Sequence, residues 1–129
     1  MSSVRVMLAV CAALCLFGAP EASARQAGPA AVVDMAFGFK FRPAEVRIRA
    51  GQSVEWRNRS FASHTVTFDP SKAGDPSLVS LPAGVEPFGS EEIASGQTWR
   101  HTFEKPGTYR YVCIPHHGEG MTGTVIVAP

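Results

Sequence analysis

The chain has 129 residues, of which 18% are charged, and its formal net charge at pH 7 is +1 with histidines neutral. Twelve basic and 11 acidic side chains give no strong excess of either sign, so the composition points away from nucleic acid as a partner. The length fits one main domain.

The N-terminus has the ordered features of a secretory signal peptide. Arg5 provides a positive start, residues 6–17 form an apolar run, and Ala22-Ser23-Ala24 fits the small-x-small cleavage rule. We expect residues 1–24 to be a signal peptide and residues 25–129 to be a single exported domain, periplasmic or otherwise outside the cytoplasm. The run is shorter than the about 20 residues that span a bilayer, so an uncleaved membrane anchor is the weaker alternative, and we expect no membrane span in the mature protein.

The cysteines also separate the two parts of the chain. Cys11 and Cys15 lie in the apolar run, and neither follows the small residue that a lipoprotein anchor usually has. Only Cys113 would remain after cleavage, so the domain cannot form an internal disulfide. A lone cysteine in an exported protein meets oxidising conditions. Metal ligation would protect the thiolate, and the alternative is an inert buried thiol.

The mature chain is typical of short strands separated by turns. Apolar and polar residues alternate with period two, and no sustained helical apolar pattern follows residue 24. The residues expected to share a face, strand by strand, are Val46 and Ile48; Val54 and Trp56; His64, Val66 and Phe68; Trp99, His101 and Phe103; Tyr109, Tyr111 and Cys113; and Met121, Gly123, Val125 and Val127. Several short strands of this kind predict an all-β sandwich.

Residues 69–97 do not follow this pattern. The segment holds four prolines and four glycines in 29 residues. A structureless loop of that length is unusual inside a compact domain. We therefore expect short edge strands or a turn of helix within it, at positions that the sequence does not define.

Three side chains that bind soft metals lie close together near the C-terminus. His116 follows Cys113 by three residues and Met121 comes five residues later, so an imidazole, a thiolate and a thioether share one short loop. His64 faces inward on its predicted strand and is placed to add a second imidazole. Two histidines, a cysteine and a weak axial methionine are the ligands of a blue-copper electron-transfer site. Zinc also accepts two histidines and a cysteine, but it rarely takes a thioether.

These motifs resemble the small blue copper, or cupredoxin, family. Tyr-Val-Cys-Ile-Pro-His at 111–116 and Gly-Met-Thr-Gly at 120–123 look like the copper loop of plastocyanin-like proteins. A softer similarity extends upstream, so that the resemblance covers roughly residues 31–129. It implies a Greek-key β-sandwich of about seven to eight strands and one type 1 copper ion. The implied ligands are His64, Cys113, His116 and Met121.

The resemblance also implies a function. It predicts a monomeric protein, not an enzyme, that carries single electrons by Cu(I)/Cu(II) cycling. Its partners would be transient redox proteins such as cytochromes or oxidoreductases, with no nucleic acid involved.

Three positions near the predicted ligands need separate treatment. The residue after the first ligand histidine is often Asn in this family, where it ties the two ligand loops together; here it is Thr65, and its effect is open. His117 is an alternative ligand, but the motif spacing and Pro115 favour His116, and we expect His117 to be exposed. His101 shares a face with apolar neighbours and is expected to be partly packed.

Other function classes make different demands on the sequence. A copper storage or delivery protein with the same fold remains the main alternative, although delivery sites tend to be more open. A multicopper oxidase or nitrite-reductase fragment needs further histidines, whereas the chain has four, and Cys113 is not followed by one. A dinuclear CuA centre needs two cysteines in the loop. The leading interpretation is therefore an exported electron carrier.

Overall fold

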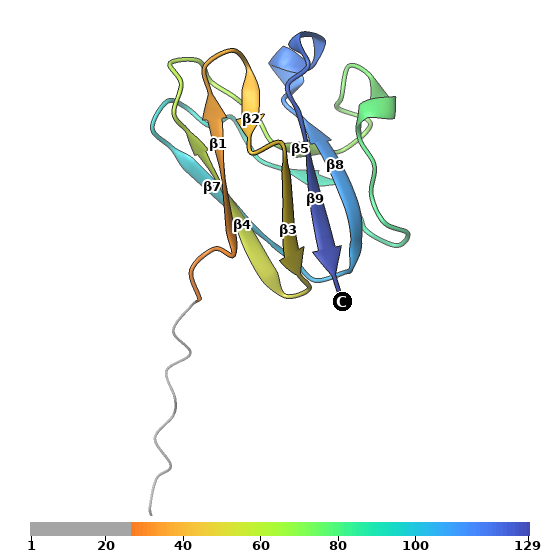
Figure 1. Ribbon diagram of the computed structural model, residues 1–129. Coiled ribbons are helices and arrows are strands. Elements are labelled where there is room, and N and C mark those ends of the chain that lie inside the picture. The colour runs from red at the N-terminus through yellow and green to blue at the C-terminus, as the bar shows by residue number, and fades with distance from the viewer. Residues whose placement is uncertain (1–26) are drawn as a thin grey trace, which may run out of the picture.

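The computed structural model describes residues 27–129 (Figure 1). The predicted signal peptide and its cleavage site lie outside the described residues. Within the described part the chain forms nine strands and two short 3-10 helices. In chain order these are β1 (Ala31–Ala36), β2 (Lys40–Arg42), β3 (Glu45–Arg49), β4 (Gln52–Asn58), β5 (Thr67–Phe68), η1 (Pro76–Leu78), β6 (Phe88–Gly89), β7 (Thr98–Phe103), β8 (Gly107–Val112), η2 (Ile114–Glu119) and β9 (Thr122–Ala128).

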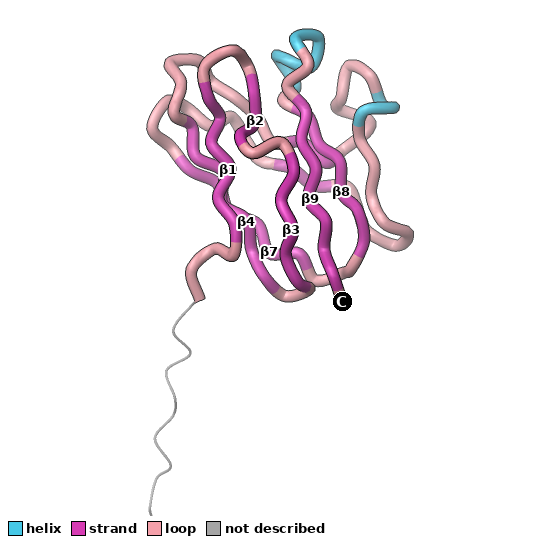
Figure 2. Tube along the Cα trace, in the orientation of Figure 1, coloured by secondary structure: helices cyan, strands magenta, loops and turns pink. Residues whose placement is uncertain are grey.

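The strands form two sheets that face each other (Figures 1 and 2). One sheet has the order β2-β1-β4-β7 and the other the order β3-β9-β8-β5-β6. β1 pairs with β4 and β3 with β9 in parallel, whereas the other strand pairs are antiparallel. The predicted all-β sandwich is confirmed. The count of nine strands exceeds the expected seven to eight because it includes β5 and β6, which are very short, with two residues each.

Large aromatic side chains fill the space between the sheets. Trp56, Phe68 and Tyr111 are each 0% exposed, and Trp56 packs edge-to-face on both of the others, with ring centroids 6.1 and 5.5 Å away. The alternation predicted for β3 and β4 is present, since every second residue points into this core. Burial of such side chains is the main stabilising contribution to the sandwich.

The strand predicted over residues 64–68 is shorter than expected. Only Thr67–Phe68 forms β5, and His64 instead makes an isolated bridge with Ile93. The ladder stops because the backbone N–H of Val66 donates to the Ser90 hydroxyl at 2.9 Å. His64 nevertheless points inward, as predicted, and is 1% exposed.

The segment 69–97 contains the edge strand and the helical turn that its length suggested. The turn η1 is capped by the Asp75 carboxylate, which accepts a hydrogen bond from the Ser77 N–H at 3.0 Å. Leading into and out of η1, Ala73 and Val79 cover Val112, which is 0% exposed on the face of β8 opposite the main core. The segment therefore buries the second face of the strand that leads to Cys113.

Three connections meet at one end of the sandwich, away from the C-terminus (Figures 1 and 2). They are the β1–β2 turn, the loop after β4, and η2 between β8 and β9. Within residues 27–129, no helix combines the length and the apolarity needed to cross a membrane.

Candidate metal centre

Two separate parts of the chain bring the predicted ligands together. Cys113 follows β8 directly, His116 lies in η2, and Met121 precedes β9. The loop closes on itself, because the Cys113 N–H donates to the Met121 carbonyl at 3.0 Å and the Met121 N–H donates to the His116 carbonyl at 3.3 Å. Gly120 makes the return possible, since its φ of 77° lies in the left-handed region. His64 reaches this loop from 49 residues upstream of Cys113.

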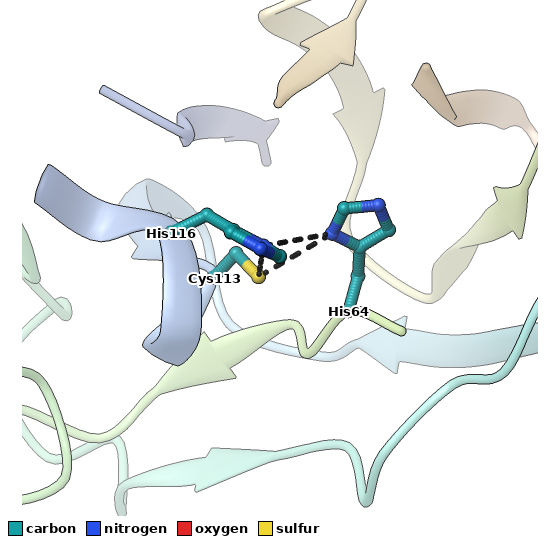
Figure 3. Close-up of side chains that lie close together, drawn as sticks. All are labelled: His64, Cys113 and His116. Carbon is teal, nitrogen blue, oxygen red and sulfur yellow. Dashed lines mark hydrogen bonds between the residues drawn. The ribbon is translucent and has the colours of Figure 1, made fainter. Parts of the chain in front are cut away.

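Three donor atoms converge on one point (Figure 3). The His64 and His116 Nδ1 atoms are 3.2 Å apart, and Cys113 Sγ lies 3.6 and 3.4 Å from them respectively. Metal bonds of about 2.0 Å to nitrogen and about 2.3 Å to thiolate, as for zinc, would separate such donors by about 3.3 to 3.7 Å. The donors therefore fit around one metal ion without rearrangement of the chain.

The donor chemistry selects copper. Cys113 and Met121 are each 0% exposed, and the hydrogen bond from the Cys113 N–H to the Met121 carbonyl joins the two ends of the loop. A soft thiolate and a thioether beside two imidazoles favour copper over hard cations.

Thr65 connects the two ligand loops. Its hydroxyl accepts a hydrogen bond from the Ile114 N–H at 2.8 Å, and its own N–H donates to Cys113 Sγ at 3.4 Å. The Thr67 hydroxyl donates to the Thr65 hydroxyl at 3.3 Å. Thr65 thus links the two ligand loops by hydrogen bonds, as the asparagine often found at this position in the family does.

A buried polar network holds the far side of the His64 ring. Since Nδ1 faces the other donors, Nε2 carries the proton of the neutral ring and donates to the Ser60 hydroxyl at 2.7 Å. That hydroxyl lies 2.9 Å from Asn58 Oδ1, and the Asn58 amide donates to the Ala62 and Ile93 carbonyls at 2.7 and 2.9 Å. A hydrogen bond of this kind fixes the tautomer and the orientation of a ligating imidazole.

Sequence reasoning did not identify Ser60 or Asn58. Ser60 precedes His64 by four residues, and this spacing alone does not predict a contact. The conformation of the loop brings the two side chains together. Asn58 is the last residue of β4, and the strand pattern gave its amide no role.

Burial shifts the pKa values of Cys113 and His64. It raises the pKa of the Cys113 thiol, against hydrogen bonds from Thr65 and His116 that lower it. Burial also lowers the pKa of His64, and the neighbouring His116 acts in the same direction. Both shifts favour the uncharged forms. Metal binding requires the thiolate, so it must displace the thiol proton.

The structure changes one expectation and supports another. His117 is half-buried rather than exposed, because its Nδ1–H donates to the Ile114 carbonyl at 2.8 Å and its ring packs on Gly74. A Cβ at Gly74 would lie 2.3 Å from this ring. His101 is partly packed as expected, stacked on Phe88 with ring centroids 4.0 Å apart.

Three phenylalanines gather beside the histidines, and we call them the aromatic patch: Phe37, Phe39 and Phe61. They are the large apolar side chains that stay exposed in the described part of the chain, at 71%, 36% and 87%. Phe37 and Phe61 pack edge-to-face at 5.8 Å. The patch borders a hollow of about 300 Å³ that reaches His64.

Comparisons with known proteins agree with this geometry. The family profile described as copper binding proteins, plastocyanin/azurin family, matches residues 30–128. Plastocyanin from Scenedesmus fuscus is 36% identical over 89 residues, which cover 67% of this chain and 85% of that protein. Chloroplastic plastocyanin from Tetradesmus obliquus is 37% identical over 91 residues, and the match spans 57% of that longer protein.

Solved structures of amicyanin variants share the fold. A Cu(I) form is 34% identical with a TM-score of 0.60, covering 81% of this chain and 87% of that one. An oxidised form is 33% identical with the same score and coverage.

Proposed function

Since the chain belongs to the plastocyanin/azurin family of copper-binding proteins, we propose that it is an exported type 1 copper protein that carries single electrons between redox partners and catalyses no reaction of its own. Its cofactor is one type 1 copper ion. We further propose that His64, Cys113, His116 and Met121 bind this ion. The observation that carries the proposal is the convergence of two imidazole nitrogens and the Cys113 sulfur within bonding reach of a single ion.

The protein surroundings suit rapid electron transfer. Copper supplies the one-electron couple when bound. The chain holds His64 with the Ser60 hydroxyl, and Thr65 ties the loop of Cys113 to the loop of His64. A donor set that is already in place needs little rearrangement when the charge on the metal changes. The same rigidity argues against a role in delivery, which requires ligands that open.

His116 is the proposed point of electron entry and exit. It is half-buried, whereas His64 is 1% exposed. The aromatic patch beside these rings offers an apolar surface of the kind that marks interaction sites. A brief encounter with a redox partner on this end needs only a small interface, at about 1,200 Å² or less. The proposed carrier acts as a monomer.

Export and processing complete the proposal. Cleavage after Ala24 would release residues 25–129 as one domain outside the cytoplasm. The intact mass of the secreted protein tests this directly. A mass that still includes residues 1–24 contradicts it.

A visible spectrum of the copper-loaded protein tests the function. The oxidised protein should be intensely blue, because the Cys113 thiolate gives strong charge transfer to Cu(II) in a trigonal site. Cys113→Ser should remove the colour, and a blue Cys113→Ser protein contradicts the assignment. Reversible voltammetry with slow copper loss to a chelator supports electron transfer. Rapid copper loss supports storage or delivery instead.

A further inference from the structure

Phe39 has an unusual backbone conformation for its residue type. It lies in the turn between β1 and β2 with φ of 52°, after Gly38 with φ of 82°. Among residues 27–129 it is the only non-glycine residue with positive φ. This region is unfavourable for a side chain with a Cβ, and Gly or Asn occupies it more readily. A phenylalanine held here needs a contact that compensates for the strain.

The Phe39 ring makes that contact with His116. The two rings are stacked with centroids 4.1 Å apart and planes at 25°. Phe39 also meets His64 edge-on at 6.4 Å and 73°. Phe37, two residues earlier in the same turn, packs instead on Phe61. Only one of the two phenylalanines in the turn therefore stacks on a proposed ligand.

His116 lacks the support that His64 receives. His64 Nε2 is bonded to Ser60, whereas within the described residues no group hydrogen-bonds His116 Nε2; its Nδ1 faces only Cys113 and His64. The backbone of His116 is also irregular, with φ of −124° and ψ of 16° inside η2. Within residues 27–129, neither a hydrogen bond at Nε2 nor a regular helix fixes this imidazole.

We propose that Phe39 is a positioning residue for the copper site, and that its ring holds the His116 imidazole with Nδ1 directed at Cys113 Sγ. The stack takes the place of the hydrogen bond that positions His64. It also shields one face of the half-buried His116 ring from water. The proposal rests on the proposed function in one respect, since it requires His116 to be a ligand.

The test replaces the His116 side chain with free imidazole. In copper-loaded full-length His116→Gly protein, added imidazole should restore the blue absorption, and its titration gives an imidazole dissociation constant. Adding Phe39→Leu should weaken imidazole binding by about 2- to 10-fold, the range expected for a lost aromatic stack. Adding Phe37→Leu, the matched control from the same turn, should change it by less than about 2-fold.

The outcomes separate the two claims. Equal effects of Phe39→Leu and Phe37→Leu would overturn the positioning role while leaving His116 as a ligand. If imidazole restores the colour in none of the three proteins, His116 is not a ligand, and the positioning role is overturned with it.

A second variant separates positioning from simple structural support. Asn tolerates the left-handed region, so Phe39→Asn should leave the unfolding temperature of the copper-free protein unchanged or raise it. In the His116→Gly background it should weaken imidazole binding as Phe39→Leu does. A lower unfolding temperature together with unchanged imidazole binding would show that Phe39 only supports the turn.

Discussion

The two histidines of the proposed site are held by different means, although their Nδ1 atoms are 3.2 Å apart. His116 lies on a loop that closes through its own backbone, and an aromatic ring covers it. His64 comes from a distant loop and is fixed by a buried hydroxyl and amide. The proposed site therefore has a buried inner ligand, His64, and a partly exposed outer ligand, His116. An electron carrier needs the first to hold the metal and the second to meet a partner.

Replacing each histidine by glycine gives the largest test of this difference. His116→Gly should lose the blue colour and regain it with added imidazole, because the gap opens toward solvent. His64→Gly should not be restored at the same imidazole concentration, because the residue is 1% exposed and the gap would be enclosed. The blue absorbance across an imidazole titration is the measurement. Equal restoration in both variants would remove the distinction between inner and outer ligand.

Ser60→Ala should weaken the inner ligand alone. The His64 Nε2–H loses its acceptor at 2.7 Å, and loss of such a partner typically lowers metal affinity by about 10- to 100-fold. Copper affinity from competition with a chelator is the measurement.

Two control variants accompany this experiment. Ser60→Thr keeps the hydroxyl and should restore most of the affinity. Ser63 lies in the same loop, and its side chain makes no hydrogen bond within residues 27–129. Ser63→Ala should therefore have little effect on copper affinity. Ser60→Ala with unchanged affinity would mean that backbone contacts suffice to hold His64.

The same contrast explains what the sequence could predict. The proposed ligands Cys113, His116 and Met121 lie within nine residues, so their spacing alone indicated a shared site. His64 was predicted because period two put its side chain on the inner face, which remained true although the strand itself was interrupted. Ser60 and Phe39 gave no such indication, because their contacts depend on how distant loops meet. Periodicity describes faces of strands, and it does not describe the packing of loop on loop.

Thr65 joins the two loops, and its removal should have a smaller effect. Thr65→Val keeps the shape but leaves the Ile114 N–H without its acceptor at 2.8 Å. An unpaired buried donor costs about 1 kcal/mol or more, less where water reaches it. We expect a loss of unfolding free energy of about 1 kcal/mol in the copper-free protein, measured by denaturant titration. Thr65→Ser keeps the hydroxyl and should retain most of the stability, and a Thr65→Val protein as stable as the wild type would show that the Thr65 hydroxyl does not stabilise the fold.

His101 provides the smallest effect and lies outside the metal site. Its ring is stacked on Phe88 and lies parallel to Trp99, and burial lowers its pKa below the ordinary value. In the unfolded chain the imidazole binds a proton below about pH 6.5, whereas the folded protein resists protonation until a lower pH. Folding stability should therefore fall as pH decreases below about 6.5, and the pH dependence due to His101 should vanish above it.

His101→Phe keeps an aromatic ring and removes the titration. The stability difference between variant and wild type should therefore grow in favour of the variant as pH falls from about 7 to about 5. Measured on the copper-free protein, this difference isolates His101, since His64 titrates in the same direction in both proteins. A difference that stays constant across that range would show that packing alone, and not protonation, distinguishes the two side chains.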